Sequence, residues 1–433
     1  MARRIPTLLA VATLATLTLS ACGSNNSSNG ASGPSGDGAS SKPVTLTFWG
    51  TYGNGGNSAQ TDMLQKTVIP AFEAANPGIT IQYVDMPYDS LLQKLTTGAA
   101  AGQLPDLVRA DIGWVPKFGA LNVFAPLDQS MSDFQKLADD TYPGSLATNK
   151  FGDHYYGLPL DTNTRVLISN ADALKKAGIS KPPATFDDLT SEAAALSKQG
   201  VSAFADSGLQ GWNVYPWIWS AGGSVTDDAQ TKATGYLNSP QSVAGVQMLV
   251  DLYKAGAIPN LIIGNKGATQ TSDGLPKGKY ASILDGPWMS DIWKQQYASF
   301  KPVYSAVPAG PGGSVSVVGG EDIAMTTSSK NQEAAQKFIA FTQTADYQIN
   351  MAKTGQMSVV KSLDSQESAA MPEFAPFIKQ LATARPRPSV PQAPAIDTAL
   401  ADELTKAFEG KESVQKALDA AAAAIDPLLT QTN

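Results

Sequence analysis

Apolar positions recur along the chain with two alternating periods, and these periods predict its elements. Residues 44–49 alternate apolar and polar side chains, and residues 79–84 form a second short apolar run, as expected of strands. Residues 60–75 and 89–100 follow these segments and are expected to form helices, the second with its leucines on one side. Residues 104–111 predict a third strand. This order is typical of an α/β unit with a parallel sheet.

The rest of the pattern divides the folded body into two lobes. Residues 155–168 pass from an aromatic turn to an apolar strand with no helix between them, which marks a lobe boundary. Residues 303–308 predict a strand that returns to the first lobe. A chain of 433 residues also exceeds the usual size of one core. We therefore expect an α/β protein of two lobes.

The N-terminal segment has the pattern of a secretory signal. Arg3 and Arg4 precede an apolar stretch over residues 5–19, which is too short to span a bilayer comfortably. The tetrapeptide Leu-Ser-Ala-Cys that ends at Cys22 resembles the lipobox of bacterial lipoproteins, in which the Cys is acylated and the preceding peptide removed. We expect residues 1–21 to be a lipoprotein signal peptide. Residues 22–43, rich in Ser, Asn and Gly, are expected to form a flexible tether.

Composition excludes several function classes. A single Cys and a single His cannot form a four-ligand Cys/His zinc site. His154 lies in a polar turn without a Ser or Cys motif, so we expect a surface or loop residue rather than a catalytic base. The net charge of −7 argues against a nucleic-acid partner. We expect neither a cofactor nor a metal, and the Gly-rich loop over 50–57 lacks the ending of a phosphate loop.

The most informative motif is Asp285-Gly286-Pro287-Trp288, which follows an apolar run. It places a rigid corner and a large indole just beyond a buried strand, where ligands bind in α/β proteins. A Trp beside an Asp offers a sugar ring an apolar face and an acceptor for its hydroxyls. Two other interpretations stay open: Trp288 could pack the following helix, and Asp285 could cap the turn that aims it.

Two further side chains have equally local alternatives. Asp111 ends the third strand, where it either accepts ligand hydrogens or caps the helix that starts near Trp114. Arg387 lies in a Pro-rich segment and either enters a cleft or stays on a surface loop.

Trp and Gly residues supply the remaining signals. Trp212 begins a predicted helix and is a candidate platform for a ligand, whereas Trp217 and Trp219 are expected in the core. Gly319 and Gly320 interrupt a strand and indicate a bulge or a close approach of the backbone to something bound.

The order of these motifs resembles that of bacterial extracellular solute-binding proteins, in the sugar-binding group that includes maltose-binding protein. The resemblance covers about residues 44–425. It rests on Leu46-Thr47-Phe48-Trp49, Leu104-Pro105-Asp106, Tyr156-Gly157-Leu158-Pro159, Pro183-Ala184-Thr185-Phe186-Asp187-Asp188-Leu189, Asp285-Gly286-Pro287-Trp288 and Pro308-Ala309-Gly310-Pro311-Gly312-Gly313.

The resemblance implies a periplasmic-binding-protein-like fold, in which each lobe is a mainly parallel sheet flanked by helices. Hinge crossovers are expected near residues 159–163, 305–308 and 343–346. The N-terminal lobe would comprise residues 44–160 and 306–344, and the C-terminal lobe residues 161–305 and 345–433.

The family's ligand positions carry over individually. Trp288 and Trp212 match platforms that stack on sugar rings, and Asp111 matches a carboxylate that accepts hydroxyl hydrogens. Gly319 and Gly320 match a backbone approach. Five other ligand candidates follow from loop position: Tyr52, Asp161, Asp285, Glu321 and Arg387. The chain departs from maltose-binding protein in the loop after the first strand and in the Pro-rich region, so maltose itself is not implied.

The implied function is high-affinity capture of a sugar, of two rings or more, and its delivery to an ABC importer. The implied partners are that importer's permease subunits with a cytoplasmic ATPase, and the cell membrane, reached from outside through the lipid at Cys22. A monomer without catalytic activity is expected. Two alternatives remain: a lipid-anchored secreted glycosidase that uses paired carboxylates such as Asp285 and Asp161, and the same fold binding a polyol or another non-sugar solute.

Overall fold

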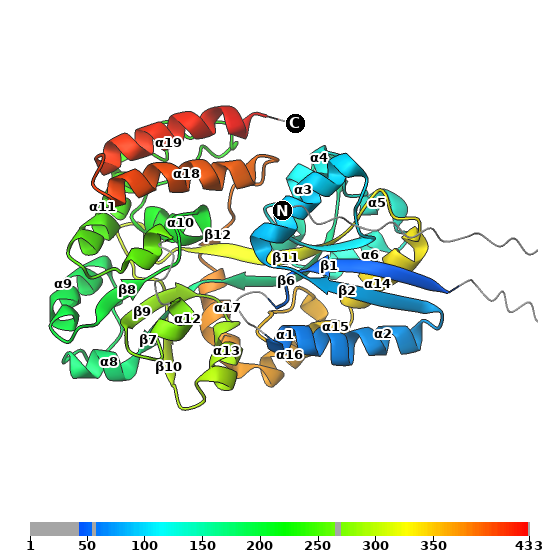
Figure 1. Cartoon of the computed structure of the whole chain (residues 1–433), viewed down its shortest axis with the longest axis horizontal. Helices are drawn as coiled ribbons and strands as arrows, with labels where there is room; N and C mark the ends of the chain where they lie inside the picture. Colours follow the sequence, from blue (N-terminus) through cyan, green and yellow to red (C-terminus); the bar gives the residue numbers. More distant parts are fainter. Residues whose placement is uncertain (1–42, 54–57, 265–269, 432–433) are drawn as a thin grey trace, which may run out of the picture. The chain divides into compact units, whose positions relative to one another are not determined.

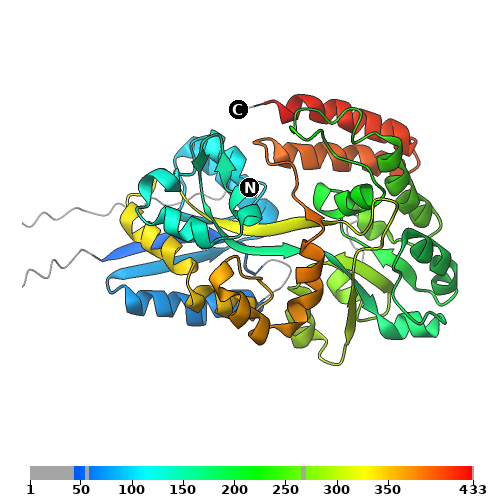
Figure 2. The same ribbon diagram turned by 180° about the vertical axis from the view of Figure 1, so that it is seen from behind.

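Two β-sheets, each with helices on both faces, organise the computed structural model of the chain (Figures 1 and 2). The structure describes residues 43–53, 58–264 and 270–431. The expected signal peptide, Cys22 and the expected tether up to residue 42 lie outside the described residues.

The first sheet has the strand order β12-β11-β3-β1-β2, and β6 also pairs with β11. The β1–β2, β1–β3 and β11–β12 pairs are parallel, whereas β11 is antiparallel to both β3 and β6. The strands are β1 (Val44–Gly50), β2 (Ile79–Asp85), β3 (Leu107–Asp111), β6 (Leu158–Thr164), β11 (Ser316–Met325) and β12 (Ala384–Arg385).

Successive residues of β3 enter two different cores. Leu107 packs with Phe72 and Phe338 on one face of the sheet, whereas Val108 packs with Leu91 and Phe118 on the other. Burial on both faces is typical of parallel strands between helical layers. The covering helices are α1 (Ser58–Met63), the π-helical turn η2 (Leu64–Val68), α2 (Ile69–Ala75), α3 (Tyr88–Ala101), α4 (Val115–Ala120) and α14 (Gln332–Thr342).

The second sheet has the order β10-β7-β9-β8. The β8–β9 pair is parallel, and β7 is antiparallel to both β9 and β10. The strands are β7 (Val166–Asn170), β8 (Ser202–Ala205), β9 (Tyr280–Asp285) and β10 (Pro302–Ser305). The prediction that residues 303–308 return to the first lobe is wrong, because β10 pairs with β7. The period of apolar residues in a segment predicts that the segment forms a strand, but it does not show which strand it pairs with.

The helices around the second sheet bury large aromatic side chains. Trp217 and Trp219 are 1% and 4% exposed, which confirms their place in the core. Thr185 caps the helix that begins at Phe186: its side chain accepts from the N–H of Asp188, and the Asp188 side chain accepts from the N–H of Thr185. The helices are α8 (Ala171–Lys176), α9 (Phe186–Ser197), α10 (Gly211–Ser220), α11 (Pro240–Lys254), α12 (Thr271–Gly274), α13 (Met289–Gln296), α17 (Ala375–Leu381), α18 (Ala393–Phe408) and α19 (Val414–Leu429).

Shorter elements complete the body. His154 lies in the β4–β5 hairpin, is 38% exposed, and places Nδ1 2.9 Å from Asp128. These elements are α5 (Leu127–Ser130), α6 (Phe134–Asp140), α7 (Pro143–Ala147), β4 (Lys150–Phe151), β5 (His154–Tyr155), η3 (Asn260–Ile263), α15 (Ala345–Ala352), η4 (Lys361–Leu363), α16 (Asp364–Ala370) and η5 (Pro372–Phe374).

The predicted α/β class with two lobes is confirmed, with parallel and antiparallel pairs in each sheet. The strands β6 and β11 run side by side from one lobe toward the other (Figure 1). The lobe boundaries stay a prediction. Tyr347 and Met351 of α15 pack in the core of the first lobe.

Gly320 carries a specific backbone constraint in β11. Its φ is +142°, and a Cβ there would lie 2.3 Å from the carbonyl oxygen of Asp161 on β6. We expect Gly320→Ala to lower the free energy of unfolding by about 2–5 kcal/mol, from strain and overpacking together. Urea titration measures the loss. The matched control is Gly410→Ala, with φ +74° and no atom within 4 Å, which should lose about 1–2 kcal/mol. Equal losses would contradict the expectation.

Candidate ligand-binding cleft

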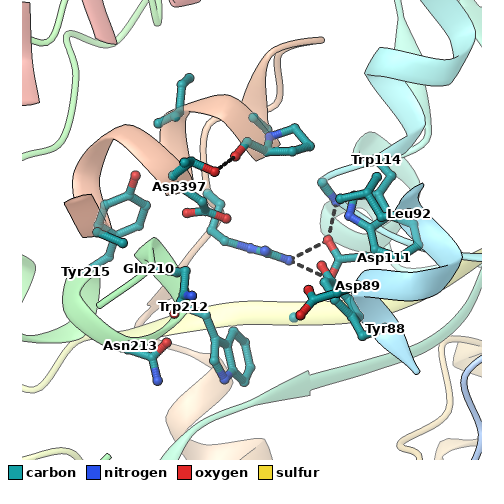
Figure 3. Close-up of a pocket in the computed structure, with 18 of the residues that line it drawn as sticks. Tyr88, Asp89, Leu92, Asp111, Trp114, Gln210, Trp212, Asn213, Tyr215 and Asp397 are labelled. Carbon is teal, nitrogen blue, oxygen red and sulfur yellow. Dashed lines mark hydrogen bonds and ion pairs between the residues drawn. The ribbon is translucent and has the colours of Figure 1, made fainter. Parts of the chain in front are cut away.

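A cleft of about 940 Å³ lies between the two lobes, where β3 and β9 end. One wall comes from α3 and the turn after β3, and the other from α10, α18 and the residue before α13. Asn163 of β6 and three residues of β11, Gly319, Gly320 and Glu321, line it between these walls. Figure 3 shows Tyr88, Asp89 and Asp111 facing Gln210, Trp212 and Asp397 across it.

Two indoles, Trp212 and Trp288, stack on one another in the cleft. Their ring centroids lie 6.2 Å apart, with the planes inclined by 29°. Each ring rests on a glycine: an added Cβ would lie 2.2 Å from the Trp288 ring at Gly286 and 2.6 Å from the Trp212 ring at Gly319. The corner Asp-Gly-Pro-Trp thus folds its indole back over its own glycine. The close approach expected at Gly319 is made to the protein's own indole.

An ion pair crosses the cleft between Arg387 and Asp111. Nη2 of Arg387 donates to Oδ1 of Asp111 at 2.8 Å and to Oδ2 at 3.1 Å. The backbone N–H of Gly113 also donates to Oδ1, at 2.7 Å, so Asp111 caps the turn before α4. Both charged side chains are 12% exposed. Arg387 therefore lies in the cleft and not on a surface loop.

A buried cation lies behind the cleft. Nη2 of Arg109 is 2.9 Å from Oε2 of Glu321 and 3.5 Å from Oδ2 of Asp161. Burial disfavours the charge on Arg109, but these two carboxylates hold its pKa above the ordinary value. Burial and the charge of Glu321 raise the pKa of Asp161 well above its usual range. Glu321 is 20% exposed and lines the cleft, which leaves it within reach of a ligand.

Three predicted ligand residues do not line the cleft. Tyr52 is fully buried, and its hydroxyl pairs with that of Tyr347. Asp161 is 3% exposed and serves Arg109. Asp285 accepts a hydrogen bond from the N–H of Gly286 at 2.9 Å, so it stabilises the corner that carries Trp288. The glycosidase alternative therefore loses support from the pair Asp285 and Asp161, neither of which lines the cleft.

Other cleft residues were not singled out from the sequence. Tyr88 lies on α3, Asn163 on β6, Tyr215 on α10 and Asp397 on α18. Each belongs to a regular helix or strand. Asp397 could have been found only by knowing that α18 packs beside α10.

The residues that the structure describes contain neither a candidate metal site nor a helix that could span a membrane. Within residues 43–53, 58–264 and 270–431, no group of three or more His, Cys, Asp or Glu side chains could hold a metal ion. In the same part of the chain, no helix has the length and apolar character needed to cross a membrane.

The sequence pattern of bacterial extracellular solute-binding proteins matches residues 56–349, more than half of the chain. The chain belongs to this family. A Brucella abortus protein named as a binding protein is 29% identical over 384 residues, covering 86% of this chain and 91% of that protein. The galactooligosaccharide-binding protein of Bacillus subtilis is 25% identical over 370 residues, 82% of this chain and 84% of its own.

Solved structures share the fold of this solute-binding protein. The GacH receptor of Streptomyces glaucescens, solved unliganded and with acarbose, has a TM-score of 0.80 at 23% identity and covers 89% of this chain and 98% of its own. Maltose-bound MalE3 of T. maritima has a TM-score of 0.77 at 23% identity, with 89% and 99% covered. The two-lobed architecture is that of these proteins.

The corner residue Asp285 gives the solute-binding protein a pH-dependent stability. Burial raises its pKa to about 6, from an ordinary 3.8, against the opposing charge of Arg165. The native state thus keeps a proton that the unfolded chain loses between about pH 4 and 6. The contribution to stability is full below this window and is lost as the pH rises through it, by up to about 3 kcal/mol.

We expect Asp285→Asn to remove this dependence, because the amide keeps the acceptor oxygen for Gly286 but does not titrate. Denaturant unfolding at pH 4, 5, 6 and 7 measures the difference in unfolding free energy between wild type and variant. That difference should fall across the window. Asp172→Asn, at an exposed position of α8, controls for the general effect of removing a charge. A difference that is constant with pH would contradict the assignment.

Proposed function

We propose that this solute-binding protein captures a sugar of two or more rings outside the cell and delivers it to an ABC importer. The observation that carries the proposal is the stack of Trp212 and Trp288 within a cleft that also presents Glu321 and Asp397. The C–H face of a sugar ring packs on an indole, and its hydroxyls form charge-assisted hydrogen bonds with carboxylates. No phosphate-binding loop or basic patch competes with this chemistry in the described cleft, where Arg387 already pairs with Asp111.

The volume of the cleft and the ligands of similar proteins support a ligand larger than one ring. Small-molecule pockets span about 300–1,000 Å³, and this cleft, at about 940 Å³, is near the upper limit. The Bacillus subtilis relative is named for galactooligosaccharides, and the two similar structures were solved with acarbose and with maltose.

Capture follows from the arrangement of the two lobes. The cleft takes residues from both of them, and β6 with β11 connects them. A ligand that contacts both walls favours a closed arrangement over an open one by its extra contacts. Closure excludes water and strengthens each hydrogen bond to the ligand.

The protein binds its ligand without changing it, in this proposal, as its relatives are named for binding. After incubation with maltotriose or a galactooligosaccharide, chromatography of the denatured mixture should return the sugar intact. Release of shorter sugars would favour a glycosidase instead. A thermal-shift screen of mono-, di- and oligosaccharides, with polyols included, identifies the ligand class, because a specific ligand raises the melting temperature by mass action.

The location we propose is the outer face of the cell membrane, through acylation of Cys22. The importer's permease subunits would receive the sugar there, with ATP hydrolysed on the cytoplasmic side, and the binding protein would act as a monomer. We expect Cys22→Ala to move the protein from the membrane fraction to the medium or periplasm, because the thiol is the acylation site. Fractionation with immunoblotting checks this. Retention of the variant with the membrane would contradict a lipid anchor at Cys22.

Loss of the indole at Trp288 tests the binding site directly. We expect Trp288→Ala to lower the affinity for the best stabilising sugar of the screen by about 1–3 kcal/mol, the cost of truncating a buried anchor. Isothermal titration calorimetry measures it. Trp49→Ala is the matched control. Trp49 lies on β1 and does not line the cleft, and Nζ of Lys94 on α3 lies 4.2 Å from the centroid of its ring. An unchanged affinity in Trp288→Ala would contradict the site.

A further inference from the structure

A second buried arginine, Arg165, lies behind the indoles of the cleft and does not line it. It is the residue between β6 and β7, where the chain passes from the first sheet to the second. The side chains of Arg165 and Asp206 are each 2% exposed, and Nη2 of Arg165 lies 2.8 Å from Oδ1 of Asp206. A buried charge is costly unless it is paired and hydrogen-bonded. The other acceptors of Arg165 therefore indicate what this residue does.

The guanidinium of Arg165 reaches the backbone of both segments that carry the indoles. Nη1 donates to the carbonyl oxygen of Trp212 at 3.0 Å, and Nη2 also donates to the carbonyl oxygen of Leu284. Leu284 directly precedes the corner that ends in Trp288. The guanidinium carbon lies 5.5 Å from the ring centroid of Trp212, within the range of a cation–π contact. One cation thus joins the two indole-bearing segments.

The carboxylate of Asp206 connects the same ion pair to α10. Its Oδ1 also accepts from the backbone N–H of Ser207 at 2.8 Å and from Nδ2 of Asn213 at 2.6 Å. Asn213 follows Trp212 in the first turn of α10. The start of this helix is therefore fixed twice, through the carbonyl group of Trp212 and through the side chain of Asn213.

The backbone of Arg165 is held separately from its side chain. Oγ of Ser316, at the start of β11, donates to the carbonyl oxygen of Arg165 at 2.7 Å. One residue earlier, Oγ1 of Thr164 donates to the carbonyl oxygen of Val317 at 2.8 Å. Both bonds join the end of β6 to β11, and neither uses the guanidinium. A change of the side chain at residue 165 therefore leaves this connection between the strands in place.

The stacked indoles do not fix their own arrangement. Aromatic pairs are stable over a range of centroid distances and tilts, so contact between the rings of Trp212 and Trp288 allows several geometries. The observed distance of 6.2 Å and inclination of 29° depend on where the two backbone segments lie. A platform that is already arranged before a ligand arrives loses less conformational entropy on binding.

We propose that Arg165 is a positioning residue of the binding site, which holds Trp212 and Trp288 in the arrangement that stacks on a sugar. It acts through the backbone of the two indole-bearing segments and does not contact the ligand. Its effect on affinity rests on the proposed function, whereas its effect on the indole pair requires no ligand. The two effects are therefore measured separately.

Two variants of the mature chain remove the role of the guanidinium. Arg165→Lys keeps a positive charge for Asp206, but the compact ammonium lacks the planar fork that reaches both carbonyl oxygens. Arg165→Met combined with Asp206→Asn leaves neither charge unpaired and keeps an acceptor oxygen at residue 206.

Two control variants accompany them. Arg385→Lys makes the same change at an exposed position of β12. Gly410→Ala, at a residue that does not line the cleft, lowers stability without touching the indoles.

Circular dichroism of the ligand-free protein reports on the indole pair. Two indoles in contact couple, and the contribution that is lost both in Trp212→Phe and in Trp288→Phe identifies this coupling. We expect Arg165→Lys to lose most of this contribution, because the coupling depends on the distance and tilt of the rings. Arg385→Lys and Gly410→Ala should retain it, which separates the effect from a general loss of stability.

Calorimetric titration with maltotriose and with β-1,4-galactotriose measures the effect on affinity. We expect Arg165→Lys to weaken binding of the sugar that wild type binds by about 5–50-fold, within the cost of truncating an anchor residue. In a Trp212→Ala background, the same change should weaken binding by less than about 3-fold, because one of the two indoles that Arg165 positions is then absent. Both control variants should bind as wild type does.

Three results would overturn the role of Arg165. The first is an indole contribution that Arg165→Lys retains, and the second is an affinity loss of the same size with and without Trp212. The third is loss of the indole contribution at wild-type affinity, because the arrangement would then not matter for binding. If Arg165→Lys does not fold, the neutral pair of substitutions decides, and failure of both to fold would show a purely structural residue.

Wild type that binds neither trisaccharide would contradict the proposed function instead. The dichroism of Arg165→Lys would still decide whether this residue arranges the indoles, so the two failures are distinguishable.

Discussion

The geometry of the cleft depends on the ion pairs of the Arg109 guanidinium with Glu321 and Asp161. Arg109 lies on β3, and its guanidinium reaches Glu321 on β11 at 2.9 Å and Asp161 on β6 at 3.5 Å. These three strands meet behind the cleft, and two of them continue toward the second lobe. Removal of one partner from a buried ion pair leaves an uncompensated charge and is strongly destabilising. The cation therefore fixes the strands relative to one another, and the carboxylate that it orients, Glu321, faces the cleft.

A second constraint is space, and glycines provide it. The indoles of Trp288 and Trp212 occupy the volume that side chains at Gly286 and Gly319 would take. Gly211 does the same for Tyr215 and Asp397. In each case a backbone without a side chain lets a large or charged group lie flat against the wall. The groups that would touch a ligand are thus held by packing, which limits the conformational entropy that binding has to remove.

The apolar periods predicted β1, β2, β3 and α3, because burial of one face or both dictates which positions are apolar. They could not predict that β10 pairs with β7, because a period carries no information about the neighbouring strand. The same limit applies to the cleft. Tyr52 and Trp288 both follow strand ends, yet Tyr52 turns into the core beneath Arg109, whose guanidinium carbon lies 4.4 Å from its ring centroid.

Two of the cleft residues that local signals did find lie beside glycine or proline. Trp288 and Arg387 lie in rigid, irregular segments, where a large or charged side chain has a reason to be placed. Asp397 lies in the middle of a helical pattern and meets Gly211 only through a contact between residues 186 positions apart. Such a residue becomes visible only when the packing of α18 against the second lobe is known. Long-range packing, and not composition, decides which carboxylates a ligand can reach.

The carboxylates of the cleft are not equivalent acceptors. Asp111 already takes two hydrogen bonds from Arg387 and one from the backbone, so a ligand hydroxyl must displace a charged donor to use it. Glu321 pairs with Arg109, whereas one oxygen of Asp397 accepts no hydrogen bond from the residues that the structure describes. A hydroxyl gains most where it replaces water rather than a guanidinium, since the net value of a hydrogen bond depends on what it exchanges. How available each of these three acidic side chains is to a further donor therefore follows from its protein partners, and the Arg387–Asp111 pair joins the two walls of the cleft.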